Sequence, residues 1–131
     1  MLKSKFISNI LELLLDGEEE IINVKLQLKY LFESNYKYTD SGVFISFDYK
    51  IGIEKYKVNK NNLVLSGVVI NSTELEIEAE CLLFFKNGLI EYLEIYSSDE
   101  NYPRKELKNY ELSQEWNNSP GRKIIVEKTS G

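Results

Sequence analysis

The most conspicuous chemical feature of the sequence is a run of carboxylates at alternate positions. Glutamate occupies every second residue of one segment, at Glu74, Glu76, Glu78 and Glu80. Side chains of an extended strand alternate between its two faces, so all four carboxylates would share one face at a spacing of ~7 Å. The interleaved residues are apolar and would point the other way. We therefore expect a linear acidic stripe along a strand.

This stripe has three interpretations. The carboxylates can form a solvated outer face, whose charge also keeps strands from aggregating edge to edge. They can instead form an anionic surface for a basic partner, such as the phosphate-binding cleft of a nuclease. A divalent-cation site is the weakest interpretation, because carboxylates strung along a strand diverge whereas Ca²⁺ or Mg²⁺ needs converging ligands. We predict no metal site.

A second group of acidic and aromatic residues follows in the segment 91–96, which reads EYLEIY. An adjacent strand could place Glu91 or Glu94 near another carboxylate as paired acids for glycoside hydrolysis, but that chemistry needs a cleft and a defined separation, which spacing does not reveal. Surface carboxylates are the simpler interpretation, with Glu94 partly buried by its apolar neighbours and hydrogen-bonded to a partner. Together with the acidic stripe, Glu91, Tyr92, Glu94 and Tyr96 form our candidate partner-binding surface.

The sequence has no histidine and a single cysteine, Cys81. The lack of histidine excludes a His-activated nucleophile and the common zinc and non-haem iron sites. Cys81 begins an apolar run, 81–85, so we expect a buried small side chain. A lone cysteine cannot form an intramolecular disulfide, which favours a reducing, cytoplasmic compartment. The isolated glycines form no phosphate-binding loop. We predict no catalytic residue and no cofactor, hence not an enzyme.

Length and charge limit the organisation and the partners. The 131 residues, 43% of them hydrophobic, suit one domain spanning 1–131 with one core. Sixteen basic against 21 acidic residues give a net charge of −5. A nucleic-acid binder must gather positive charge, so this balance argues against nucleic acid and favours a basic protein partner. No segment has the apolar length of a membrane span or the pattern of a signal peptide, so no membrane partner is expected.

The apolar periodicity predicts helices first and strands afterwards. Residues 3–15 have helical spacing, and a second helix should begin after three glutamates, 18–20, and give way to a strand near Tyr30. Period-two segments predict strands at 43–49, 63–70 and 73–85, with a weaker strand at 53–58 and a turn at Asn71-Ser72. A short strand or turn near 109–112 and an edge strand at 124–126 complete the set.

The clearest local signal is Asn87-Gly88, which is typical of a type I′ hairpin turn. A two-residue loop would oppose Phe85 to Ile90 and Phe84 to Glu91, and would place the run 81–85 at the centre of the sheet. The predicted fold class is α+β, with one or two N-terminal helices packed on a largely antiparallel, meander-type sheet of about five to seven strands.

Several of these motifs occur together in a recognisable order. They are Leu13-Leu14-Leu15-Asp16-Gly17, Leu26-Gln27-Leu28, Thr39, Gly42-Val43-Phe44, Phe47, the segment 83–96, Asp99 and Tyr102-Pro103. In this order the chain resembles a group of small uncharacterised bacterial α+β proteins over most of residues 11–103. These motifs are turns and strands, so the resemblance implies a common fold rather than a common activity. At the level of class, the short acidic chain also resembles the immunity proteins that neutralise bacterial toxins, which implies a tight inhibitory complex.

We therefore expect a protein-binding module, of the immunity type, that docks a basic partner such as a cognate toxin through its acidic and aromatic surface. One alternative is a small-molecule-binding or enzymatic domain with a pocket between sheet and helices. A structural homo-oligomer, such as a homodimer, is another alternative.

Overall fold

The structure, a computed structural model, describes residues 1–16, 19–72, 76–99, 101–115 and 121–127. Within these ranges the predicted α+β class is confirmed: the chain forms one α-helix, two 3-10 segments and seven strands. In chain order the elements are α1 (Lys5–Leu15), η1 (Glu19–Tyr30), β1 (Leu31–Tyr38), β2 (Gly42–Tyr49), η2 (Ile53–Tyr56), β3 (Val64–Ser72), β4 (Ile77–Lys86), β5 (Leu89–Ser97), β6 (Tyr110–Gln114) and β7 (Lys123–Val126).

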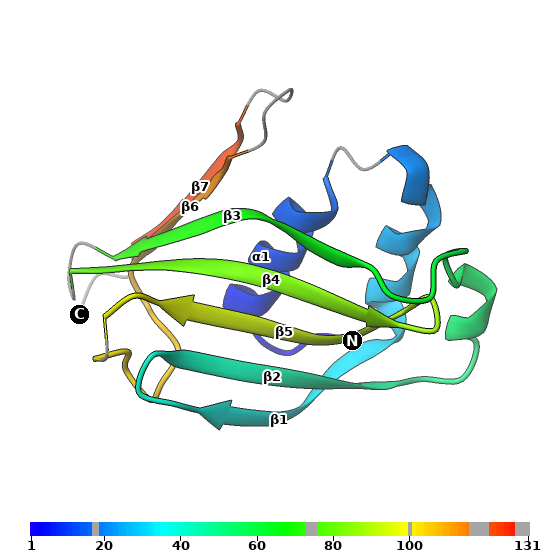
Figure 1. The fold of residues 1–131 in the computed structure, drawn as a ribbon, viewed down its shortest axis with the longest axis horizontal. Helices are drawn as coiled ribbons and strands as arrows, with labels where there is room; N and C mark the ends of the chain where they lie inside the picture. The colour runs from blue at the N-terminus through cyan, green and yellow to red at the C-terminus, as the bar shows by residue number, and fades with distance from the viewer. Residues whose placement is uncertain (17–18, 73–75, 100, 116–120, 128–131) are drawn as a thin grey trace.

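All seven strands belong to one antiparallel sheet in the order β1-β2-β5-β4-β3-β6-β7. Its centre is the meander β3-β4-β5. The hairpin β1-β2 adds to the β5 side, and the hairpin β6-β7 adds to the β3 side (Figure 1). As predicted, β4, which contains the apolar run 81–85, lies in the middle of the sheet.

Helix α1 begins at a serine cap. The Ser4 hydroxyl accepts a hydrogen bond from the Ile7 amide at 3.1 Å, which satisfies a donor that has no partner inside the helix. The amides of Lys3 and Ser4 instead donate to the Glu33 carboxylate of β1. Because these two residues are held outside the helix, α1 starts at Lys5, two residues later than the periodicity indicates.

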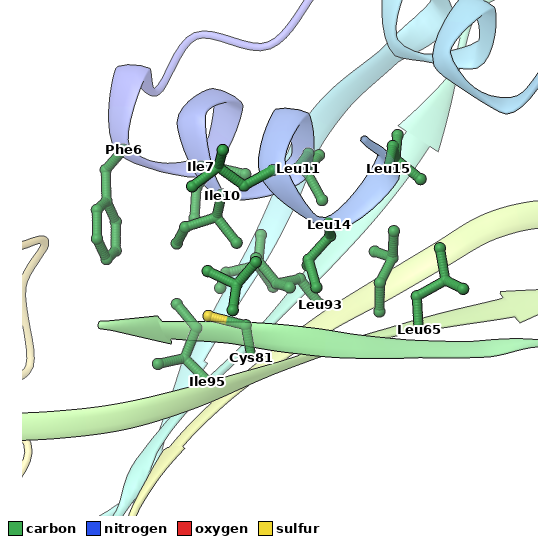
Figure 2. Packing of buried hydrophobic residues seen from close by; sticks show 14 of the residues in the cluster. Phe6, Ile7, Ile10, Leu11, Leu14, Leu15, Leu65, Cys81, Leu93 and Ile95 are labelled. Carbon is green, nitrogen blue, oxygen red and sulfur yellow. The ribbon is translucent and has the colours of Figure 1, made fainter. Parts of the chain in front are cut away.

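The hydrophobic core lies between α1 and one face of the sheet. Ile7, Ile10, Leu11 and Leu14 are fully buried, and Figure 2 shows them on the sheet side of α1, above Cys81, Leu93 and Ile95. Each such side chain stabilises the fold by roughly 1.5–3 kcal/mol through its burial. Cys81 is buried as predicted.

The segment after α1 is held by a buried amide. The second helix ends at Tyr30 as predicted, although it takes the form of the 3-10 segment η1. Gln27 in η1 is fully buried; its Nε2 donates to the carbonyls of Tyr56 and Gly88, and its Oε1 accepts from the Ile90 amide. This one side chain therefore ties η1 to η2 and to the turn between β4 and β5.

The predicted hairpin is present, but its register changes two residue pairs beyond the turn. Asn87 and Gly88 have φ values of 52° and 80°, as a type I′ turn requires, and Phe85 faces Ile90. Glu91 is then an extra residue at a β-bulge, so Phe84 faces Tyr92 rather than Glu91. The predicted pairs beyond Phe85 are therefore wrong by one residue.

Two further expectations are corrected. The weak strand at 53–58 is wrong: Gly52, at φ 108°, turns the chain into η2, whose Tyr56 ring packs 5.6 Å from that of Tyr30. The turn at Asn71-Ser72 is also wrong, because both residues pair with β4 inside β3. Among the helices of the described residues, none has the length and apolar character needed to cross a membrane.

Candidate functional site

The side of the sheet opposite α1 is covered by no helix or strand among the described residues (Figure 1). Strand alternation assigns side chains to it: Leu93 and Ile95 of β5 point into the core, so Tyr92, Glu94 and Tyr96 point outward. We call this surface of the three neighbouring strands the open face. Its outward side chains include Phe44, Ser46 and Asp48 of β2, Tyr92, Glu94 and Tyr96 of β5, and Glu78, Glu80, Leu82, Phe84 and Lys86 of β4.

Three aromatic rings gather at the middle of the open face. Phe84 and Tyr92 stack with centroids 4.4 Å apart at an interplanar angle of 13°, and the Phe44 ring lies 6.1 Å from that of Tyr92. The strand register causes this, since β5 brings Tyr92 opposite Phe84 on one side and near Phe44 on the other. Such a ring pair contributes about 0.5–1.5 kcal/mol beyond its burial. All three rings remain half-buried, so they still present apolar surface to solvent.

Carboxylates lie along one side of these rings. Glu78 and Glu80 are exposed on β4, and Glu80 lies opposite Tyr96, which is 44% exposed. Glu94 is half-buried, as predicted, and lies in register between Phe44 of β2 and Leu82 of β4. The open face thus combines an apolar centre, formed by Phe44, Tyr92 and Phe84, with an anionic flank, formed by Glu78, Glu80 and Glu94.

Two shallow hollows border the anionic flank. The first, about 320 Å³, lies where β4 begins and β5 ends. It is lined by Glu78, Ala79, Glu80, Tyr96, Ser98 and Asp99. The second, about 220 Å³, lies beside the register shift of β3, between Leu65 and Val68, and includes Glu80, Leu82 and Glu115 in its lining. Their volumes lie at or below the lower end of the range for small-molecule pockets. Within the described ranges, no three Asp, Glu or Cys residues are arranged as metal ligands.

The structure brings together five of the eight residues that the sequence assigned to the binding surface. Glu78, Glu80, Tyr92, Glu94 and Tyr96 share the open face. The four-residue stripe is wrong at Glu76, which lies in the turn before β4 with φ 51° and therefore does not continue the strand. Glu74 lies outside the described residues.

Glu91 is also placed differently from the expectation. It is the extra residue of the bulge in β5 and lies near Tyr49, whose hydroxyl donates to the Ile90 carbonyl at 2.7 Å. Burial and the nearby Glu91 carboxylate both raise the pKa of the Tyr49 hydroxyl. Glu91 therefore belongs to the turn end of the sheet.

Three apolar residues of the open face escaped the sequence analysis: Phe44, Leu82 and Phe84. Their signal was present, because each alternates with buried neighbours along its strand. An apolar residue at an outward position is typical either of a sheet covered on both sides or of a binding surface. Cys81 points into the core, where burial raises the pKa of its thiol and keeps it protonated and unreactive.

Comparison of the chain with protein-family models, with curated proteins and with solved structures found no match in any of the three.

Proposed function

We propose that this chain is a protein-binding module that docks a basic protein partner on its open face. The observation that carries this proposal is the half-buried cluster of the Phe44, Tyr92 and Phe84 rings beside an anionic flank. Aromatic side chains are the commonest anchors of protein interfaces, and complementary charge accelerates association. Without a binding partner, large apolar side chains on the outer side of an antiparallel sheet lower the solubility of the protein.

The open face, together with the flanking strands β1 and β3, is large enough for such a partner. The strands β1, β2, β5, β4 and β3 lie side by side and each has at least eight residues. At ~4.8 Å between strands and ~3.3 Å per residue, they span roughly 600 Å² in projection. One side of a stable protein interface buries about 800 Å² of accessible surface, which a rough surface of that projected size supplies.

We propose further that the partner is a toxin and that the chain acts as its immunity protein in the cytoplasm. Support comes from the small acidic chain and from its resemblance in class to such proteins. In this role, Glu78 and Glu80 would attract the basic surface of the toxin, and the ring stack would hold it. A pocket between helix and sheet receives less support, because the α1 side chains pack directly on the sheet (Figure 2).

The test is to co-express the chain with the product of each neighbouring reading frame, to score rescue of growth and to measure affinity by calorimetry. The variant Phe84→Ser with Tyr92→Ser should lower the affinity for the neutralised product at least about 100-fold, since anchors often contribute 2 kcal/mol or more each. Glu54→Lys on η2, far from the open face, is the control. Unchanged affinity in the double variant would reject the docking proposal, and a larger particle in light scattering of the chain alone would support the homodimer instead.

A further inference from the structure

Glu94 stands out among the polar side chains of the sheet. It is half-buried in the centre of β5, with Phe44 and Leu82 as its register partners on the two adjacent strands. Among the residues that the structure describes, none forms a hydrogen bond or ion pair with its carboxylate. By contrast, the buried amides of Asn9 and Gln27 have partners. Its carboxylate oxygens reach solvent, so they are free to accept hydrogen bonds from a cationic group of another molecule.

The rings next to Glu94 define the shape of that partner. Tyr92, two residues before Glu94 on the same side of β5, stacks on Phe84, and Phe44 lies beside both Tyr92 and Glu94. A group that binds the carboxylate therefore lies beside aromatic rings. The site favours a group that is cationic at its tip and able to lie flat on a ring.

An arginine side chain meets both demands. Its guanidinium is planar, stacks on aromatic rings and donates two parallel hydrogen bonds to one carboxylate. A lysine ammonium supplies the charge but neither the planar surface nor the paired donors. We propose that Glu94, Phe44 and Tyr92 form the anchor site for an arginine of the protein partner, an inference that rests on the proposed function.

A second copy of this chain is a poor source of that arginine. The chain contains two arginines. Arg122 lies 2.9 Å from Asp16, and Arg104 lies 3.1 Å from Asp40, so both are already paired. A symmetric pair of open faces would also oppose two anionic flanks. The occupant is therefore a different, basic protein.

The experiment is an amide chemical-shift titration of the full chain with three short peptides of the form acetyl-Gly-X-Gly-amide, where X is arginine, lysine or citrulline. Citrulline keeps the shape of arginine but lacks its charge. We expect the arginine peptide to shift amides around Phe44, Leu82 and Glu94, with the lysine peptide binding at least about tenfold more weakly and citrulline giving no shift. Glu94→Gln should abolish the arginine response, and Phe44→Leu should weaken it severalfold.

The matched control is Glu54→Gln, which removes one exposed carboxylate from η2 and should leave the titration unchanged. Four results would each overturn the anchor proposal: equal affinity for the arginine and lysine peptides, chemical-shift changes centred elsewhere, no change at the highest soluble peptide concentration, or a full response in Glu94→Gln. Such a result leaves the docking proposal intact, because that proposal fails only if the Phe84 and Tyr92 double variant keeps its affinity for the partner.

Discussion

Replacing Gln27 by methionine tests how the hairpin that carries the open face is held. Methionine is close to glutamine in length and volume, so the change removes three hydrogen bonds without opening a large cavity. The Gly88 carbonyl keeps a bond from the Val58 amide at 3.0 Å, whereas the Tyr56 carbonyl and the Ile90 amide each lose the bond that Gln27 gives them.

One buried and one partly buried backbone group thus lose a hydrogen bond, at about 1–3 kcal/mol each. We expect the free energy of unfolding to fall by about 2–4 kcal/mol. For a chain of this length, that loss lowers the melting temperature by roughly 10 °C.

Urea unfolding followed by circular dichroism measures this loss directly, with the neighbouring Leu28→Met as the control for a change to methionine. A large effect in Gln27→Met alone supports the role of the amide as a tie between η1 and the β4-β5 turn. A change below about 0.5 kcal/mol would refute the reasoning, because ordinary surface substitutions reach that value.

Three further predictions concern stability and reactivity. Hydrogen bonds from Arg122 and Gln114 lower the pKa of Asp16 to about 2. The contribution of Asp16 to the free energy of unfolding is therefore complete above the unfolded pKa near 3.8 and is lost as pH falls toward 2. In urea unfolding, the free energies of wild type and Asp16→Asn should differ by about 1–2 kcal/mol at pH 7 and converge toward pH 2. The buried Cys81 thiol should react with a disulfide reagent at least about 100-fold more slowly in the native protein than in urea, and rapid native reaction would contradict its place in the core. Gly42→Ala should destabilise by about 3 kcal/mol or more in thermal melts, because a Cβ there collides with the Ile95 carbonyl and separates β2 from β5; a neutral effect would question that strand pairing.

The elements that the sequence predicted well are those with a strong local signal. The apolar spacing of Ile7, Ile10 and Leu14 specifies the buried side of α1. Asn87-Gly88 specifies its turn, since few other pairs accept two consecutive positive φ values. The centre of the sheet follows from the apolar run that starts at Cys81.

The errors arise where non-local contacts decide the conformation. The alternation of glutamate continues through Glu76 into β4, so periodicity alone does not reveal that the strand starts only at Ile77. The bulge at Glu91 has no sequence signal, because it reflects how β5 fits both β4 and its contact with Gln27. The ring stack requires β2 to pair with β5 across the intervening chain, a pairing that single-strand patterns do not specify.

Docking on the open face can be examined by hydroxyl-radical footprinting of the chain, free and in complex with a reading-frame product that it neutralises. This measurement reads the solvent exposure of individual side chains. We expect Phe84, Tyr92 and the exposed Tyr96 to lose reactivity in the complex, while Ile51, which is fully exposed at the opposite end of β2 from Gly42, keeps it. A stable complex in which Tyr92 and Phe84 remain as reactive as in the free chain would show that the partner binds elsewhere.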